Sequence, residues 1–419
     1  MPTTDEAAPR PAAGPATSRR DAGSEQVARV ARDVMQPIPP IPSDTTNDGV
    51  REILARHPEI SLAAVLDGGR PAGVIHRHAF METYARPFAR DLYGKKSCTT
   101  LMRADPLVVD AEMSIAELAR LAIARGSQVL EHGFVVTSAG AYAGIGLGSA
   151  LVAALSALEE ERSRQLQESV NYASTIQRAM LASSTEVLAR ALPDSSLLWE
   201  PRDLVGGDCY CFREVPSGLA GAVLDCTGHG VPGALMTCIA LAAVERAFGD
   251  PAVAEDPGLV LSRLDAAIKA TLRHGDAGTH DGLDGLVFHL SRDRAELRIA
   301  SARIPAFVRS GGTVQLVPAT RASVGTALTP DQQTWPAATI PLAPGALVAI
   351  ATDGFTDQIG GPRKIAYGKR RLFALLGGTG RLDAAATAAA FRNEHQAWQA
   401  DEPRRDDATF LAFTPRPAP

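Results

Sequence analysis

The stretch GLAGAVLDCTGHGVPGALMT, residues 218–237, contains in order a strand, a turn and the start of a helix. Its first residues are small or apolar up to Asp225, which is typical of a buried strand. The GHG segment at 228–230 allows a sharp turn, and Pro232 stands where helices commonly begin. We therefore predict a buried strand that carries an aspartate at its end, followed by a core helix over 233–248. The apolar run at 231–244 is too short to span a membrane.

Further strand-like runs and a second helical run lie on the C-terminal side of this stretch. The strand-like runs are LDGLVFHL, AELRIASA, TVQLV and ALVAIATD, and the helical run covers 257–272. Gly311-Gly312 precedes TVQLV as a hairpin turn would. Many antiparallel strands with a few helices indicate a layered α+β fold.

The composition excludes several functional classes. The chain has 419 residues, 45% of them apolar, which suffices for two or three domains. Its 42 Lys and Arg against 47 Asp and Glu give a net charge of -5, so we expect no nucleic-acid partner. The five cysteines show no disulfide framework and the N-terminus lacks an apolar signal core, so we predict a cytoplasmic protein.

An uncharged stretch at 136–158 has the length of a membrane helix. Its glycines at 140, 144, 146 and 148 lower its hydrophobicity and indicate strand and turn in its first half. We therefore expect no membrane span.

Aspartates terminate several runs of small or apolar residues. They are Asp208 in LVGGD, Asp225 in AVLD, Asp353 in VAIATDG, and Asp406 with Asp407 in RRDDATF. Carboxylates at the ends of buried strands can converge on one sheet edge, where raised pKa values or bound cations relieve their repulsion. Oxygen-only clusters favour Mg²⁺ or Mn²⁺. A single Asp before glycine is more often a turn residue, so the argument depends on the whole set.

The residues of four segments, and the order of these segments along the chain, indicate a family. LVGGDCY, VLDCTGHGVPGALMT, ATDGFTDQIG and RRDDATF resemble the sequential signature of the metal-dependent PPM (PP2C-type) serine/threonine phosphatases, in their bacterial SpoIIE-like branch. The segments NYASTIQRAML at 171–181, DGLDG at 281–285 and DQIGGPRKIAYGKRR at 357–371 resemble the SiaA-like subgroup. The resemblance covers about half of the chain.

The resemblance implies an αββα sandwich with two Mn²⁺ or Mg²⁺ ions at one end. Asp225 would bridge the ions and the backbone carbonyl of Cys226 would bind one of them. Asp208, Asp353 and Asp406 would complete the cluster, and Asp407 would orient Asp406 or serve as a ligand itself. Asp208, Asp225 and Asp353 are thus the expected catalytic residues. A water activated by the ions would displace the phosphate without a phosphoenzyme.

The same resemblance implies a phosphorylated STAS-type anti-sigma-factor antagonist or similar regulator as substrate, with a cognate kinase acting in opposition. Two alternatives stay open: a catalytically weak scaffold, and a protein whose main property is ligand sensing by its N-terminal half.

Some residues near the aspartates permit two interpretations. His229 could donate a proton to the leaving oxygen, or it could organise the glycine turn by hydrogen bonds. Cys209, Cys211 and Cys226 could suggest Zn²⁺, but their spacing favours structural thiols. A basic cluster could dock an acidic or phosphorylated protein, or form a solvated face; it comprises Lys364, Lys369, Arg370 and Arg371.

The remaining chain predicts three further parts. Residues 1–44, rich in Ala and Pro, are expected to be a disordered tail. Residues 45–150 weakly resemble a degenerate pair of CBS modules, a small α/β domain. Such a domain would either sense a ligand, with an adenine nucleotide as the candidate, or serve only in dimerisation or docking. The stretch 151–187 predicts a long helix, either a coiled coil in a homodimer or a monomeric amphipathic helix. The phosphatase-like domain is expected over 188–415.

Overall fold

The computed structural model describes residues 27–126, 132–272 and 280–416. The chain divides into unit 1, residues 1–165, and unit 2, residues 166–419. Helix α6 (Gly148–Ala191) begins in unit 1 and ends in unit 2, so the predicted long helix is continuous and extends past both expected ends.

Unit 2 contains two five-stranded antiparallel sheets. The first has the order β10 (Asp208–Val215), β11 (Gly218–Cys226), β12 (Leu283–Ser291), β13 (Glu296–Ala302) and β16 (Ala338–Pro341). The second has the order β15 (Thr313–Val317), β14 (Ala306–Ser310), β17 (Leu347–Ala351), β20 (Ala408–Phe413) and β9 (Ser195–Glu200). Their strands are short and alternate with turns, as the sequence pattern requires.

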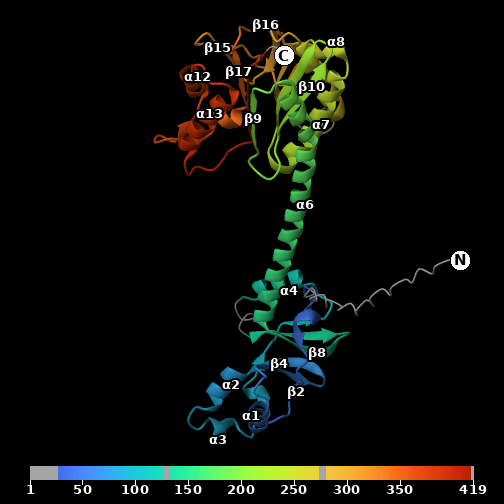
Figure 1. Ribbon diagram of the computed structural model, residues 1–419. Coiled ribbons are helices and arrows are strands. Elements are labelled where there is room, and N and C mark those ends of the chain that lie inside the picture. Colours follow the sequence, from blue (N-terminus) through green and yellow to red (C-terminus); the bar gives the residue numbers. More distant parts are fainter. Residues whose placement is uncertain (1–26, 127–131, 273–279, 417–419) are drawn as a thin grey trace, which may run out of the picture. The chain divides into compact units, whose positions relative to one another are not determined.

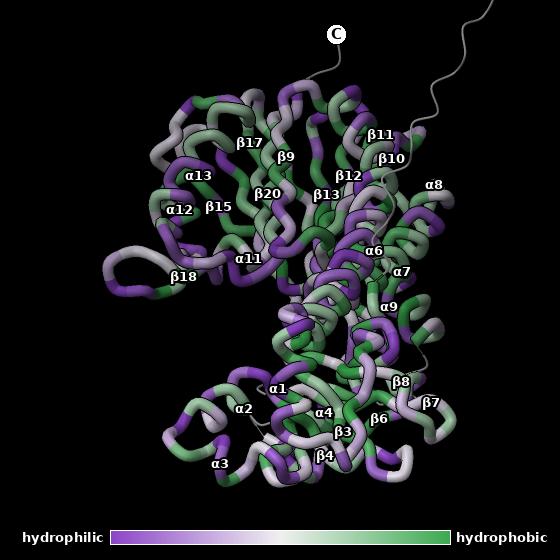
Figure 2. The backbone as a smooth tube through the Cα atoms, turned by 90° about the horizontal axis from the view of Figure 1, so that it is seen from below, coloured by the Kyte–Doolittle hydropathy of each residue, from purple (hydrophilic) through white to green (hydrophobic). Residues whose placement is uncertain are grey.

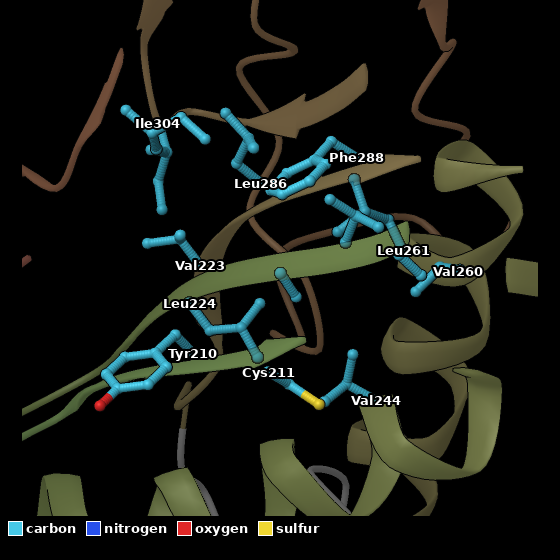
Figure 3. Packing of buried hydrophobic residues seen from close by; sticks show 14 of the residues in the cluster. Tyr210, Cys211, Val223, Leu224, Val244, Val260, Leu261, Leu286, Phe288 and Ile304 are labelled. Carbon is cyan, nitrogen blue, oxygen red and sulfur yellow. The ribbon is translucent and has the colours of Figure 1, made fainter. Parts of the chain in front are cut away.

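The two sheets pack face to face. Phe288 of β12 stacks on Phe413 of β20 with ring centroids 5.3 Å apart, and both side chains are buried. Figure 3 shows Phe288 within the apolar cluster that fills this part of unit 2. Burial of aromatic rings on facing sheets supplies much of the apolar area that stabilises such a sandwich.

Helices cover the outer faces of both sheets (Figure 1). The helices on the side of the first sheet are α7 (Gly230–Phe248), α8 (Pro251–Ala254) and α9 (Pro257–Leu272). Those on the second sheet are α12 (Lys369–Gly378) and α13 (Ala384–Gln399). The predicted αββα sandwich is confirmed.

Helix α7 is the one helix, among the residues that the structure describes, long and apolar enough to cross a membrane. It packs on α9, β10 and β11, and buries one face that includes Ala240 and Val244. Figure 2 shows the hydrophobic segments of unit 2 gathered mainly in its strands and in parts of α7 and α9. Core helices pass the same test of length and hydropathy, so the absence of a membrane span stays a prediction.

The predicted strands and helices of unit 2 are present, with additions. Gly311-Gly312 forms the turn of a hairpin, but its first strand is β14, which the sequence did not predict. A short helix α11 (Asp353–Thr356) follows β17, and a small hairpin of β18 (Ile359–Gly360) and β19 (Ile365–Ala366) precedes α12.

Unit 1 contains two four-stranded sheets with related topology. One has the order β2 (Ile41–Pro42), β3 (Leu62–Asp67), β4 (Arg70–His76) and β5 (Arg103–Ala104). The other has the order β6 (Val108–Asp110), β7 (Phe134–Ser138), β8 (Ala141–Gly146) and β1 (Met35–Gln36). Among the described residues of this unit, the helices and 3-10 turns that precede α6 are η1 (Ala31–Val34), α1 (Asn47–Arg56), α2 (Arg77–Tyr84), α3 (Ala89–Tyr93), η2 (Cys98–Thr100) and α4 (Ile115–Ala124).

These two sheets are halves of an internal repeat. The turns at Gly68-Gly69 and Ala139-Gly140 both have two consecutive positive φ angles, of 55° and 83° and of 50° and 81°. In each half a short strand, β2 or β6, runs parallel to the next strand, β3 or β7. The strand that precedes it in the chain, β1 or β5, pairs with the sheet of the other half. Unit 1 therefore contains an internal repeat, and its assignment to a pair of CBS modules stays a prediction.

One expectation for the N-terminus is wrong. Residues 27–44 were expected to belong to a disordered tail, yet β1 pairs with β8 and β2 pairs with β3. Prolines near residue 40 prevent a helix but are compatible with short edge strands. Residues 1–26 of the predicted tail lie outside the described residues.

Candidate active site

The predicted aspartates meet at one end of the sandwich. Asp208 lies directly opposite Asp225 on neighbouring antiparallel strands. The sequence predicted that Asp208 ends a strand, but Asp208 is the first residue of β10. Because β10 and β11 are antiparallel, the start of β10 lies beside the end of β11. In the second sheet, Asp353 follows β17 and Asp406 precedes β20, and these two strands are also antiparallel neighbours.

Asp208 is completely buried, and only one of its two carboxylate oxygens has hydrogen-bond partners. Its Oδ2 atom accepts hydrogen bonds from the hydroxyls of Thr352 at 2.8 Å and Thr409 at 2.7 Å. Its Oδ1 atom is buried without a partner. Burial raises the pKa of Asp208 to about 7, and the charges of Asp407 and Asp353 act in the same direction. The two hydrogen bonds from the threonine hydroxyls oppose this rise.

The carboxyl groups of Asp225 and Asp353 also have raised pKa values. Burial, followed by the charges of Asp208 and Asp353, raises the pKa of Asp225 well above its ordinary value. Burial and then the neighbouring Asp357 raise the pKa of Asp353, although a hydrogen bond with Asp225 opposes the shift. Negative charge at this edge is therefore poorly compensated by the protein itself.

The two adjacent aspartates of RRDDATF have different surroundings. Asp407 is buried, and its oxygens accept hydrogen bonds from the backbone N–H groups of Arg202 at 2.7 Å and Gly207 at 2.6 Å. Asp406 is exposed and lines a cavity together with Asp225 and Asp353. The geometry leaves Asp406 accessible to a cation and gives Asp407 the role of holding the loop before β10.

Glycine brings that loop against the end of β11. A Cβ atom on Gly207 would lie 2.7 Å from the carbonyl oxygen of Cys226, so a larger residue would push the two segments apart. The N–H of Cys226 donates to the carbonyl of Gly207 at 3.0 Å. The Cys226 carbonyl, expected as a ligand, is thereby fixed beside the aspartates.

These residues fit a divalent cation, although no three His, Cys, Asp or Glu side chains in residues 27–126, 132–272 and 280–416 form a finished metal site. The donor atoms are carboxylate and carbonyl oxygens, which Mg²⁺ and Mn²⁺ prefer. The orphaned Oδ1 of Asp208 and the raised pKa values of three carboxyls are what a cation would relieve.

Two adjoining cavities of about 480 and 590 Å³ open beside the aspartates. Both are lined by Asp225, Asp353, Asp284 and Arg303. Asp284 lies opposite Asp225 on β12 and forms an ion pair with Arg303 at 3.0 Å. Neither Asp284 nor Arg303 is among the site residues predicted from the sequence. The DGLDG segment that contains Asp284 resembles the SiaA-like subgroup but implied no role for this residue.

Comparison with known proteins identifies the family of the C-terminal part of the chain. The sequence profile described as Stage II sporulation protein E (SpoIIE) matches residues 216–416. The solved SiaA-PP2C domain of Pseudomonas aeruginosa is 35% identical with a TM-score of 0.55, over 60% of this chain and 98% of that one. The chain belongs to the SpoIIE-type PP2C phosphatase family.

More distant PP2C structures are also similar. The PP2C phosphatase domain and regulatory fragment of SpoIIE from Bacillus subtilis is 17% identical, over 54% of this chain and 64% of that one, with a TM-score of 0.44. The RsbU and RsbW domains of Rv1364c from Mycobacterium tuberculosis are 19% identical, over 54% and 61%, with a TM-score of 0.41. No curated protein sequence matches the chain.

Within this PP2C domain, His229 has the surroundings of a turn residue. Its Nδ1 atom lies 3.0 Å from an Asp203 oxygen, and both side chains are about half exposed. His229 is not among the residues that line the two cavities. These contacts favour the interpretation in which it organises the glycine turn.

The thiols next to the PP2C aspartates lie in the apolar core. Cys209, Cys211 and Cys226 are buried, and burial raises the pKa of Cys211 to about 12. Figure 3 shows the Cys211 sulfur directed toward Val244 of α7. Their surroundings are those of structural thiols.

Proposed function

We propose that the chain is a Mn²⁺- or Mg²⁺-dependent serine/threonine protein phosphatase. The observation that supports it most is the meeting of Asp208, Asp225, Asp353 and Asp406 at one end of the sandwich, with an unpartnered buried oxygen on Asp208. Family membership supports the same chemistry.

Each residue has a proposed task. The bound cations would hold the phosphate oxygens and activate the attacking water. Asp225, Asp208, Asp353, Asp406 and the Cys226 carbonyl would hold the cations. Thr352 and Thr409 orient Asp208, and Asp407 fixes the loop in front of it. In the proposed hydrolysis, the water oxygen bonds to phosphorus and the water gives up a proton. The ester P–O bond breaks, its electron pair stays on the serine or threonine oxygen, and that oxygen takes up a proton, which yields inorganic phosphate and the free hydroxyl.

The substrate proposed is a phosphorylated STAS-type regulator or a similar signalling protein, with a cognate kinase in opposition. Two relatives come from systems of this kind: one structure contains RsbU and RsbW domains, and another is named as part of the bacterial stressosome. We further propose that the protein is cytoplasmic and forms a homodimer. Exposed apolar side chains of α6, Leu166, Tyr172 and Ile176, support a helix-mediated dimer.

For unit 1 we propose a regulatory role with an adenine nucleotide as ligand. Its internal repeat matches the predicted pair of modules. A nucleotide that binds the folded chain raises its melting temperature. A rise with AMP or ATP and none with inorganic phosphate would support the proposal, and no rise with either nucleotide would oppose it.

Hydrolysis of p-nitrophenyl phosphate and of a phosphorylated STAS protein by the full chain tests the main proposal. We expect turnover with Mn²⁺ or Mg²⁺, none with chelator, and none with Asp225→Asn. The matched control is Asp401→Asn, because Asp401 is exposed in the loop before Asp406. Metal-independent turnover, or full activity of Asp225→Asn, would contradict the proposal, while inactivity toward both substrates would favour a scaffold.

A further inference from the structure

Arg303 stands where the two cavities meet, beside the aspartate cluster. It lines both cavities together with Asp225 and Asp353. We propose that Arg303 binds the phosphoryl group of the substrate, an inference that rests on the proposed phosphatase function. Its ligand is a phosphate monoester dianion, recognised through guanidinium N–H groups.

The backbone of Arg303 is held in an unusual conformation. Its φ angle is 70°, in the left-handed region that a long side chain rarely adopts. The conformation is fixed because the N–H of Arg303 donates to the carbonyl of Thr320 at 2.9 Å. Glycine would occupy this position without strain, and strained non-glycine residues cluster at functional sites. The position therefore points to a use for the side chain.

The side chain is anchored at one atom only. Its Nε lies 3.0 Å from an oxygen of Asp284, whose other oxygen accepts a hydrogen bond from the hydroxyl of Ser323 at 2.6 Å. The two Nη groups of Arg303 have no hydrogen-bond partner among the residues that the structure describes, and the side chain is 55% exposed. Four N–H bonds thus remain for an oxyanion.

Arg303 lies where the phosphoryl group of a bound ester would face the expected metal ligands. Asp284, which anchors Arg303, is the direct neighbour of Asp225 on the adjacent strand. An aspartate cluster repels a phosphate dianion, so positive charge is needed beside it. Arg321 and Lys369 also line the cavities, and neither forms an ion pair within the described part of the chain. Arg303 is the cation that a neighbour already orients, which reduces the entropy lost on binding.

A purely structural ion pair makes different predictions. A half-exposed pair contributes little to stability, and lysine would serve in it nearly as well as arginine. A phosphate-binding guanidinium changes KM and the affinity for inorganic phosphate. It also permits partial rescue of a glycine variant by free guanidinium.

The test uses the full chain with Mn²⁺ and three variants. Arg303→Gly removes the side chain and tolerates the positive φ, and Arg303→Lys keeps the charge. Arg298→Ala removes an exposed, ion-paired arginine of β13 that is not among the residues lining the two cavities. We measure KM and kcat for p-nitrophenyl phosphate, inhibition by inorganic phosphate, and the rise in melting temperature caused by Mn²⁺.

For Arg303→Gly we expect KM and the inhibition constant of phosphate to rise at least tenfold, partial recovery with added guanidinium, and an unchanged Mn²⁺ effect on melting. Arg303→Lys should lie between, and Arg298→Ala should match the wild type. Wild-type KM and inhibition constants in Arg303→Gly would overturn the inference while leaving the phosphatase intact.

A wild type without turnover would instead overturn the proposed function. Calorimetric titration of inorganic phosphate into the Mn²⁺-loaded chain then decides on Arg303 independently. Phosphate binding that Arg303→Gly abolishes supports the inference, and equal binding by both, or none by the wild type, overturns it.

Discussion

The side chain of Gln177 bonds both polar atoms of the Gly206 backbone. Its Nε2 donates to the Gly206 carbonyl at 2.7 Å, and the Gly206 N–H donates to its Oε1 at 3.1 Å. Nε2 also donates to the hydroxyl of Thr237 on α7 at 3.1 Å. Gln177 belongs to the part of α6 inside unit 2 and is buried. Helix α6 thus holds the loop that leads directly into Asp208.

Gln177→Ala should therefore lower phosphatase activity without unfolding the chain. Loss of buried hydrogen bonds leaves the Gly206 groups unsatisfied, which costs on the order of 2 kcal/mol. We expect kcat/KM to fall at least tenfold, because the loop would no longer place Asp208 accurately. Gln167→Ala, on the exposed surface of the same helix, is the control and should retain wild-type kinetics. Equal kinetics for both variants would show that the contact is dispensable.

His395 makes stability sensitive to acid. It is buried, its Nε2 lies 3.1 Å from the Phe355 carbonyl, and its ring contacts the Phe355 ring edge-on at 4.9 Å. Burial lowers the pKa of His395 below its ordinary value of 6.5. The folded state then prefers the neutral ring, so the stabilisation is complete above pH 6.5 and is lost as the pH falls through the lower folded value.

Urea unfolding at several pH values checks this prediction. The wild type should lose more stability than His395→Gln as the pH falls from neutral to below 6. The comparison is between two proteins because His289, whose pKa burial also lowers, titrates equally in both. Parallel pH curves for the two would assign the acid sensitivity to other groups.

The aspartates of this site could be predicted because their signal is local. Asp225 ends a run of small and apolar residues, and such runs become central strands. The αββα arrangement followed from the resemblance of the four segments. Prolines before residue 44 were informative about helices alone, which is why the pairing of β1 and β2 was missed.

Other parts of the site depend on contacts between distant residues. Thr352 and Thr409 reach the same Asp208 oxygen only because β17 and β20 are neighbours and Asp208 lies on the facing sheet. Arg303 is distinguished by its φ angle and by its distance to Asp284, and neither is visible in composition or periodicity. Such residues carry no motif of their own.

Asp406 and Asp407 should separate into two phenotypes. Asp406→Asn should weaken the Mn²⁺-induced rise in melting temperature and remove activity, with little change in metal-free stability, because Asp406 is exposed. Asp407→Asn should instead lower the metal-free stability by about 1 to 3 kcal/mol. In the wild type two backbone N–H groups donate to the Asp407 carboxylate, and in the variant one of them would face an amide NH₂ that cannot accept. Thermal unfolding with and without Mn²⁺ distinguishes them. Identical behaviour of the two variants would argue against this division of roles.

Asp208 should destabilise the metal-free protein at neutral and alkaline pH. Its pKa is raised to about 7 from 3.8, so the folded state binds a proton that the unfolded state has released. The associated stability is complete below pH 3.8 and is lost as the pH rises through about 7. A cation that binds the ionised carboxylates reverses this loss.

Asp208→Asn should consequently raise the melting temperature of the metal-free chain at pH 8 by about 5 °C, corresponding to roughly 2 kcal/mol for a domain of this size. The same variant should lose activity and most of the Mn²⁺-induced stabilisation. At pH 5, where the wild-type carboxyl is largely protonated, the difference between the two proteins should shrink. Asp401→Asn, at an exposed position, should reproduce the wild type at both pH values. A lower melting temperature for Asp208→Asn at pH 8 would mean that the hydrogen bonds to Thr352 and Thr409 outweigh the repulsion between the buried carboxylates.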